Sequence, residues 1–188
     1  MKAGATIETG RLVLRHWRAD DIEPFHRLNS DDRVMRFFPF RRDRKQSAEM
    51  LERIRRMVAD DGFGWAAICR RDDDTTIGFS GLSRIGFETA FTPAVEIGWR
   101  LLPEHWRKGY ASEAARALLA HGFNDLGLDE IVSFAVQDNH ASTGVMRAIG
   151  MTAEPELDFD MPGIADDMAH LRRHVFYRMR REDWRARA

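Results

Sequence analysis

The segment Trp106-Arg107-Lys108-Gly109-Tyr110-Ala111-Ser112 combines residue types that together can bind a phosphate group. An alanine-rich run that predicts a helix follows it, and the first turn of a helix leaves several backbone N–H groups without partners. The helix dipole adds partial positive charge there, and Gly109 lets the backbone approach a ligand closely. Arg107 and Lys108 add formal charge. We therefore predict an anion site at this loop, of a kind that fits a pyrophosphate.

The segment is neither of two familiar phosphate-binding motifs. It lacks the spacing and the Gly-Lys-Ser/Thr ending of a Walker loop, and it lacks the three glycines of the dinucleotide fingerprint. A plain strand-to-helix connection with a glycine turn is the alternative interpretation. The segment alone leaves both interpretations open.

The elements that must position this loop predict an α/β sandwich around a mixed sheet. Residues 94–101 alternate as a strand that Pro103 ends, and apolar residues recur at helical spacing from about 110 to 126. An apolar strand at 130–136 and a helix at 139–149 follow. The other expected elements are a strand at 11–17, short helices at 21–29 and 31–37, a longer helix that Ser47 caps and Gly62 ends, strands at 65–70 and 76–84, and closing strands at 151–159 and 173–179.

The composition is that of an ordinary globular chain of 188 residues, which predicts a single domain over residues 1–188. The formal net charge of −1 provides no field that attracts nucleic acid or an anionic membrane. The single cysteine, Cys69, excludes a disulfide framework and lies in an apolar run typical of a core. No 18-residue apolar stretch and no signal-peptide core are present, so we expect a cytoplasmic setting. His170 and His174 have no evident third ligand, so no metal is predicted.

Residues 95–114, Val-Glu-Ile-Gly-Trp-Arg-Leu-Leu-Pro-Glu-His-Trp-Arg-Lys-Gly-Tyr-Ala-Ser-Glu-Ala, resemble the signature of the GCN5-related N-acetyltransferases, the GNAT family. The branch most resembled is RimJ/RimL-like, the ribosomal-protein N-terminal acetyltransferases. The resemblance extends over nearly the whole chain, through residues 9–15 and 77–81, Asn139 with Ser142, and residues 181–184. One departure is Trp106, which stands where the family's loop begins with Gln or Arg.

The resemblance implies the GNAT fold: a mixed, mostly antiparallel sheet of six to seven strands with helices on both faces and a splayed central strand pair. It also implies acetyl-CoA as co-substrate, with its pyrophosphate on the amides of residues 107–112. The pantetheine arm would pair with the backbone of residues 99–101. The implied cofactor-binding residues are Trp99, Arg100, Leu101, Arg107, Lys108, Gly109, Tyr110, Ala111, Ser112 and Asn139.

Acetyl transfer from a thioester to an amine requires a base for the ammonium and a proton donor for the leaving thiolate. Glu96 is the candidate base, directly or through water, because it lies on the strand beside the implied donor and a half-buried carboxyl has a raised pKa. A surface or ion-paired strand carboxylate is the alternative. Many family members use a tyrosine as the acid, but Met146 occupies that position, so Ser142 or water is left for the role. Asn139 either caps its helix, binds the pantetheine arm, or does both.

We therefore predict an acetyl-CoA-dependent N-acetyltransferase whose acceptor is a primary amine, either a protein N-terminus or a small molecule. The alternatives are a catalytically weak acyl-CoA-binding or regulatory module, which Met146 motivates, and a binder of nucleotide phosphates. The aromatic segment at 37–40 either walls an acceptor pocket or belongs to the core. A homodimer is possible, because two-fold dimers are the commonest assembly.

Overall fold

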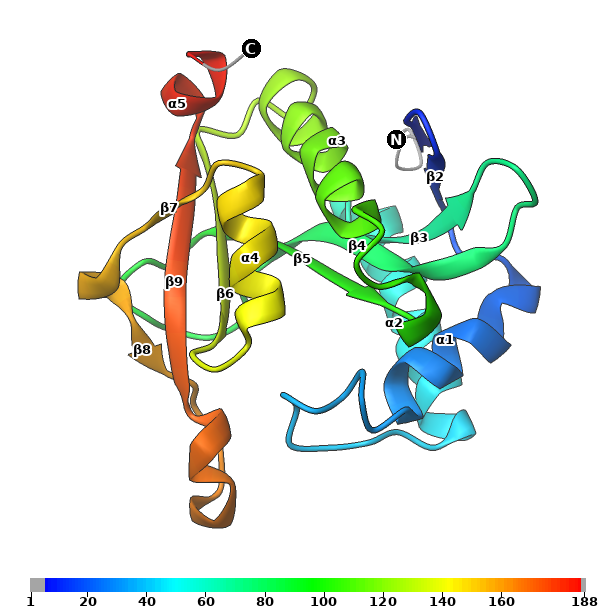
Figure 1. Ribbon diagram of the computed structural model, residues 1–188, viewed down its shortest axis with the longest axis horizontal. Coiled ribbons are helices and arrows are strands. Elements are labelled where there is room, and N and C mark those ends of the chain that lie inside the picture. The colour runs from blue at the N-terminus through cyan, green and yellow to red at the C-terminus, as the bar shows by residue number, and fades with distance from the viewer. Residues whose placement is uncertain (1–5, 187–188) are drawn as a thin grey trace.

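A single mixed sheet of nine strands organises the computed structural model, which describes residues 6–186 (Figure 1). Its order is β1-β2-β3-β4-β5-β6-β9-β7, with β8 also paired to β9, and all pairs are antiparallel except β5 with β6. The strands are β1 (Ile7–Glu8), β2 (Leu12–Arg15), β3 (Trp65–Arg70), β4 (Thr76–Arg84), β5 (Val95–Leu101), β6 (Glu130–Val136), β7 (Thr152–Ala153), β8 (Phe159–Asp160) and β9 (Arg173–Arg180). The fold class is confirmed. The strand number exceeds the expected six to seven because three strands have only two residues each.

Helices cover both faces of the sheet, as expected. Helices α3 (Tyr110–Asn124) and α4 (His140–Ala148) lie on the face nearer the viewer in Figure 1, and α1 (Ile22–Ser30) and α2 (Arg44–Asp61) lie on the far face. A short helix α5 (Arg181–Arg185) follows the last long strand. Four short 3₁₀ segments complete the described elements, at Ala19–Asp21, Pro103–His105, Pro155–Leu157 and Asp166–Leu171.

The two faces of β5 have different environments, as its alternating sequence predicts. Val95, Ile97 and Leu101 are buried in a cluster with α3 and α4. Glu96 and Arg100 therefore project from the opposite face, which α1 and α2 cover. The strand thus separates a helix-packed core from the side on which the polar residues lie.

The pairing of β5 with β6 is limited to one end. Glu96 opposite Val132 is the single register pair of these two strands, whereas β5 is paired with β4 along its whole length. The hydroxyl of Ser133 donates to the carbonyl of Ile97 at 2.9 Å and is the last tie between the strands. Beyond Ile97 the two strands diverge, so the splayed central pair is present and the edge of β5 is left open.

Three sequence-based expectations are wrong. The segment 31–37 forms turns instead of a helix. Helix α2 is capped by Asp43, whose carboxylate accepts from Gln46 N at 2.8 Å, so Ser47 lies inside the helix, where its hydroxyl donates to Asp43 O. The expected strand at 151–159 is broken into β7, a 3₁₀ turn and β8, because Pro155 cannot continue a ladder.

Two other expectations can be compared with the structure. Cys69 is fully buried among core residues, as predicted, and burial raises the pKa of its thiol. Within residues 6–186, no helix has the length and apolar character needed to cross a membrane.

Candidate active site

The loop before α3 presents a row of backbone N–H groups without acceptors. Arg107 and Gly109 both have left-handed backbones, with φ of 59° and 79°, and such a sequence of turns directs successive amides toward one side. The first N–H of the helix with a backbone acceptor is that of Glu113, which donates to Gly109 O at 3.0 Å. Within residues 6–186, the amides from Arg107 to Ser112 have no acceptor. This is the arrangement that the sequence predicts for a pyrophosphate site.

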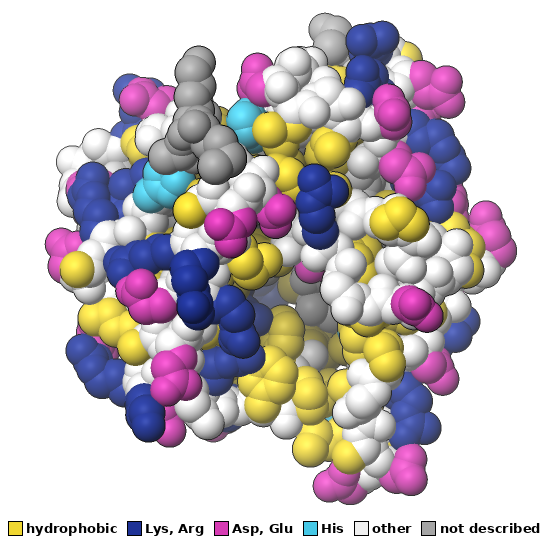
Figure 2. Space-filling model, turned by 180° about the vertical axis from the view of Figure 1, so that it is seen from behind, with side chains coloured by type: hydrophobic (Ala, Val, Ile, Leu, Met, Phe, Trp, Pro, Cys, Tyr) yellow, Lys and Arg dark blue, Asp and Glu magenta, His cyan; other side chains and the backbone are white. Residues whose placement is uncertain are grey.

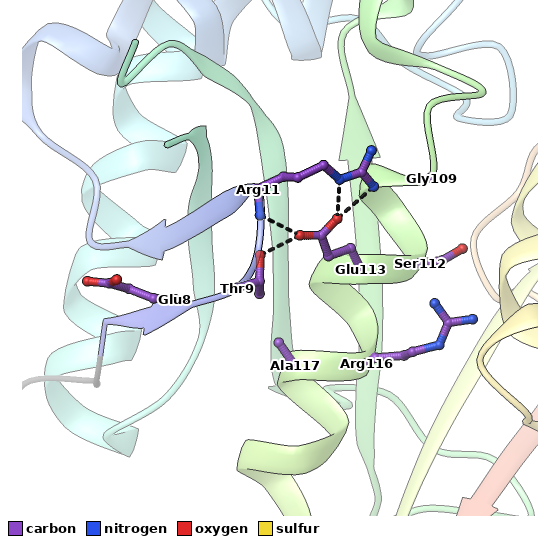
Figure 3. A pocket seen from close by; sticks show the side chains of 8 residues that line it. All are labelled: Glu8, Thr9, Arg11, Gly109, Ser112, Glu113, Arg116 and Ala117. Atoms are coloured by element: carbon purple, nitrogen blue, oxygen red, sulfur yellow. Dashed lines mark hydrogen bonds and ion pairs between the residues drawn. The ribbon is translucent and has the colours of Figure 1, made fainter. Parts of the chain in front are cut away.

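The loop is held in place by an ion pair with the N-terminal strands. Glu113 accepts from the hydroxyl of Thr9 at 2.7 Å and from the Arg11 backbone N at 2.9 Å, and it pairs with the Arg11 guanidinium (Figure 3). Burial acts to raise the pKa of Glu113, but these hydrogen bonds outweigh it and hold the pKa below its usual value. Arg11 also donates to Lys108 O at 2.9 Å and lies 4.7 Å above the ring of Tyr110.

A surface cavity of about 710 Å³ lies beside this loop. Gly109, Ser112 and Arg116 line one side, and Arg11 lies on another (Figure 3). Arg116 donates to the carbonyl of Ala148 at the end of α4 at 2.6 Å, which fixes its guanidinium near the opening. The cavity therefore places Gly109 and Ser112, whose amides have no acceptor in the described chain, beside two arginines, and the carboxylates of Glu8 and Glu113 also line it.

The open edge of β5 leads directly to this loop. The carbonyl of Ile97 points toward β6, because it accepts from Ser133. By the two-residue period of a strand, the N–H and C=O of Trp99 point the same way, into the splay. Trp106 Nε1 donates to Leu101 O at 2.8 Å and joins the end of the strand to the loop. A molecule with an extended polar arm can thus pair with the strand and reach the amides with its anionic end.

Glu96 lies on the other face of β5, at the last position before the splay. It is opposite Ser83 on β4 and Val132 on β6. It forms no hydrogen bond and no ion pair within residues 6–186, and burial raises the pKa of its carboxyl to about 7. The alternative of an ion-paired strand carboxylate is therefore wrong. A carboxyl that titrates near neutral pH is suited to accept a proton.

The start of α4 supplies two further predicted site residues. Asn139 caps the helix, which is one of the two roles predicted for it, since its Oδ1 accepts from Ser142 N at 3.2 Å. Its amide nitrogen has no partner in the described chain, and neither has the Ser142 hydroxyl. Both groups are free to bind a ligand.

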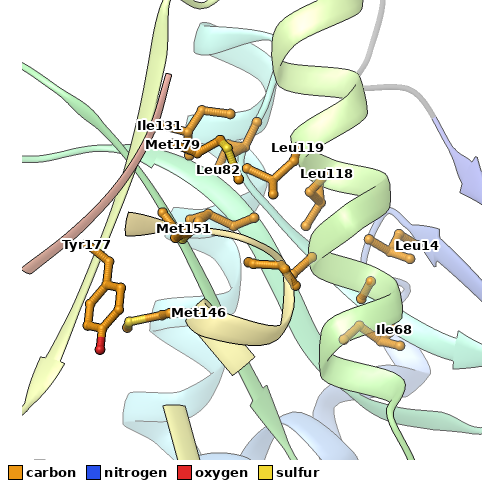
Figure 4. Close-up of a cluster of buried hydrophobic side chains, with 14 of the residues drawn as sticks. Leu14, Ile68, Leu82, Leu118, Leu119, Ile131, Met146, Met151, Tyr177 and Met179 are labelled. Atoms are coloured by element: carbon orange, nitrogen blue, oxygen red, sulfur yellow. The ribbon is translucent and has the colours of Figure 1, made fainter. Parts of the chain in front are cut away.

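Met146 is a packing residue. It is 1% exposed, belongs to the main core cluster and lies beside the ring of Tyr177 from β9 (Figure 4). The Tyr177 hydroxyl accepts from Arg147 Nη1 at 3.3 Å. A thioether in this core has no proton to donate, so Met146 cannot replace the tyrosine that serves as the acid in many family members.

A hollow on the far face of the molecule separates the half that carries α1 and α2 from the half that carries β9 (Figure 2). Hydrophobic side chains line it, and lysine and arginine side chains gather along one side. Phe38 and Phe40, from the segment between α1 and α2, are 36% and 41% exposed. They are not core aromatics, which favours the expectation that this segment walls an acceptor pocket.

Two features of this site could not be foreseen from the sequence. The contacts of Glu113 with Arg11 link residues about a hundred positions apart, and no local pattern signals such a pair. Arg100 was expected to act through its backbone, yet its guanidinium lies 4.2 Å from the ring centre of Phe38 and donates to Asn29 Oδ1 at 3.0 Å, on the face of β5 that also carries Glu96. Among the described residues, no group of three or more His, Cys, Asp or Glu could hold a metal ion.

Comparison with known proteins identifies the class. Residues 11–152 match the family described as an acetyltransferase (GNAT) domain. The uncharacterized N-acetyltransferase YoaA of Bacillus subtilis is 31% identical over 151 residues, which cover 79% of this chain and 83% of that protein. The chain belongs to the GNAT family and is an acetyl-CoA-dependent acyltransferase. The alternative of a catalytically weak acyl-CoA-binding or regulatory module is not favoured.

Solved structures agree in fold. A GNAT-family acetyltransferase from Bacillus anthracis has a TM-score of 0.78 and 25% identity, covering 95% of this chain and 99% of that one. A spermidine N-acetyltransferase from Vibrio cholerae, solved with CoA and spermine, has a TM-score of 0.74 and covers 94% of this chain and 99% of its own. Its identity of 17% supports a common fold alone.

Proposed function

We propose that this protein transfers the acetyl group of acetyl-CoA to a primary amine, with the donor bound along β5 and the loop before α3. One observation carries the proposal: six free amides, from Arg107 to Ser112, begin where the open edge of β5 ends. Coenzyme A contains both an extended amide-bearing arm and a pyrophosphate. The arm matches the open edge of β5, and the pyrophosphate matches the free amides. Arg116 supplies positive charge beside the amides, whereas the charge of Arg11 is paired with Glu113.

The residues around the arm are proposed to act through their backbone and one side chain. Trp99 to Leu101 would pair with the arm, and a backbone N–H of this strand would stabilise the developing oxyanion, a contribution of about 3–4 kcal/mol to the barrier. The Asn139 amide nitrogen would donate to the arm from the other side of the splay. Acetyl-CoA supplies the acetyl group as an activated thioester.

Glu96 is the proposed base. The acceptor reaches the active site as an ammonium ion, and its nitrogen must lose a proton before it can form the new C–N bond. A carboxyl with a pKa of about 7 is ionised often enough at neutral pH to take that proton, directly or through a water molecule. The C–S bond breaks as the amide forms, and the thiolate then takes up a proton.

Ser142 is the proposed source of that proton, with solvent as the alternative. We expect Ser142→Ala to lower kcat by about 10- to 100-fold, because the thiolate would leave without a positioned donor. The KM for acetyl-CoA should be little changed, since Asn139 still caps the helix. Steady-state kinetics with Ser142→Thr as the control tests this, because threonine keeps the hydroxyl. An unchanged kcat in Ser142→Ala would assign the proton to solvent.

The proposed function is tested by mixing the protein with acetyl-CoA and a panel of amines and by measuring free CoA with a thiol reagent. The panel contains N-terminal peptides, polyamines, amino acids and simple alkylamines. Acetylation of one class at a rate above that of the uncatalysed mixture is the expected result. Tight CoA binding without CoA release across the panel would contradict catalysis, and absence of CoA binding by calorimetry, with binding of ATP or NAD, would contradict the donor.

The acceptor class is part of this proposal. The resemblance of residues 95–114 to the RimJ/RimL-like branch supports a protein N-terminus, and the polyamine in the distant Vibrio cholerae structure shows that this fold also accommodates small amines. The cytoplasm is the proposed location, since it contains acetyl-CoA and both kinds of acceptor.

A further inference from the structure

Arg100 is a partly buried cation with no carboxylate partner. Its Nη1 donates to the neutral Oδ1 of Asn29 at 3.0 Å, and its guanidinium lies 4.2 Å from the ring centre of Phe38 and 5.0 Å from that of Phe79. Within residues 6–186 it forms no ion pair. Burial, with a smaller contribution from the positive charge of Arg42, lowers the pKa of Arg100 to about 9. Removing a cation from water without an anion is costly.

Arg42 repeats this arrangement nearby. Its guanidinium lies 4.1 Å from the ring centre of Phe40 and likewise has no ion-pair partner in the described chain. Burial lowers its pKa, and Arg53 adds to the effect. The rings of Phe38 and Phe40 are 6.1 Å apart, and Arg42 N donates to Asn29 O at 2.9 Å. The two cations thus belong to one aromatic-walled unit, even though their charges repel.

Four neighbouring arginines have carboxylate partners, unlike Arg100 and Arg42. They lie on α1, on the following segment and at the start of α2, and each has a carboxylate within 3 Å: Arg27 with Glu104, Arg33 with Asp31, Arg41 with Asp32 and Arg44 with Glu23. Acidic residues are therefore available in this region. Arg36, whose guanidinium lies 5.3 Å from the ring centre of Phe37, has no ion pair in the described chain either, but it is exposed, whereas Arg100 and Arg42 are partly buried.

Arg100 lies on the same face of β5 as the proposed base. Glu96 and Arg100 are four residues apart, about 13 Å between Cα atoms in an extended strand. Gly98 lies between them and has no side chain, and the Trp65 ring covers it so closely that an added Cβ would be 2.9 Å away. The ring closes the direct path over Gly98, so an acceptor bound at Arg100 would lie beside the Trp65 ring and face Glu96 directly or through a water molecule.

We propose that the acceptor amine carries a carboxylate, which Arg100 and Arg42 bind while the amine faces Glu96. The inference rests on the proposed function and narrows its substrate to a small amine of the amino-acid class. A guanidinium and a carboxylate form two parallel charge-assisted hydrogen bonds. The Phe38 and Phe40 rings would contact an apolar side chain of the same molecule.

The experiment compares amines that differ only in the carboxylate. L-phenylalanine is paired with phenethylamine and L-leucine with 3-methylbutylamine, with spermidine as a cationic acceptor, and kcat/KM is measured for each by CoA release. We expect the carboxylate to raise kcat/KM by about 10- to 100-fold within each pair, mostly through KM. Equal values within the pairs, or a preference for spermidine, would overturn the inference.

Arg100→Met is the diagnostic variant, because methionine keeps an apolar stem against Phe38 and Phe79. It should remove the preference by lowering kcat/KM for L-phenylalanine while phenethylamine is unaffected. The melting temperature should not fall, since an unpaired buried cation is lost. Arg185→Met on α5 makes the same change at an exposed arginine with no ion pair in the described chain. It should alter neither the preference in kcat/KM nor the melting temperature. A uniform loss over all amines in Arg100→Met would overturn the specific role.

A binding measurement separates this inference from the proposed function. 3-Phenylpropionate, which is L-phenylalanine without its amine, is titrated calorimetrically into the protein with CoA present. We expect binding that weakens at least about 10-fold in Arg100→Met. Binding with no amine acetylated would contradict the proposed function and keep the anion site. Acetylation of amines with no binding of 3-phenylpropionate would support the proposed function and contradict the anion site.

Discussion

Replacement of Glu96 by glutamine is expected to lower kcat by about 10²- to 10³-fold, because the variant has no base for the ammonium proton. The wild-type rate should fall as the pH drops below about 7, since the Glu96 carboxyl becomes protonated there, and this limb should be absent from the variant. CoA affinity should be nearly unchanged, since the loop at 107–112 is untouched. Steady-state kinetics across pH 5.5–9 and CoA calorimetry measure both effects. Glu88→Gln, which changes an exposed carboxylate, serves as the control. Unchanged turnover in Glu96→Gln would remove Glu96 as the base.

The same substitution is expected to stabilise the fold at alkaline pH. The unfolded chain releases the Glu96 proton near pH 4.5, whereas the folded chain holds it until about pH 7. Between these values the unfolded state is increasingly favoured as the pH rises, and above pH 7 the full cost applies, about 3 kcal/mol at most. Glutamine removes this cost. Urea unfolding at pH 5 and pH 8.5 should show a gain for the variant at pH 8.5 alone.

Substitution of Gly109 by valine is expected to weaken CoA binding at least about 10-fold, since the left-handed backbone there, with φ of 79°, costs a side chain about 1–2 kcal/mol or more. A Cβ at this position would also lie 3.4 Å from Arg11 Nη2, which contacts the loop. Relaxation of either strain would turn the amides away from one another. The KM for acetyl-CoA should rise, while kcat at saturation should stay close to the wild-type value.

Gly62 offers a matched control for this variant. Its φ of 78° is nearly the same, an added Cβ would meet nothing within 4 Å, and it ends α2 away from the loop. Gly62→Val should therefore lower the melting temperature without a change in CoA affinity. Equal loss of CoA affinity in both variants would show that general destabilisation, not the loop, causes the effect.

The sequence predicted the elements whose signals are local. The bounds of β3, β4 and β6 match the expected strands, because each is a run of β-forming residues between turn residues. Asn139 was recognised as a cap for the same reason. Errors arose where two local signals competed: Asp43 and Ser47 are both capping residues, and the Gln46 side chain completes a capping box with Asp43 alone.

The sequence offered a local signal only for the proposed donor half of the site. The loop at 107–112 is one continuous segment, so its residue types reveal its chemistry. The proposed acceptor half is assembled from α1, the segment after it and β5. The environment of Arg100 depends on Asn29, Phe38 and Phe79, which are distant in sequence. The burial that raises the Glu96 pKa likewise comes from strands that only the tertiary fold brings together.

The contacts of Glu113 with Thr9 and Arg11 couple the docking of β1 and β2 to the shape of the donor loop. Whatever binds the loop in its ordered form must, by thermodynamic linkage, also favour the docked form of these strands. Occupancy by the donor should thus protect the beginning of the chain from proteases and slow its amide hydrogen exchange. The state of this edge strand then becomes a remote reporter of whether the enzyme is loaded.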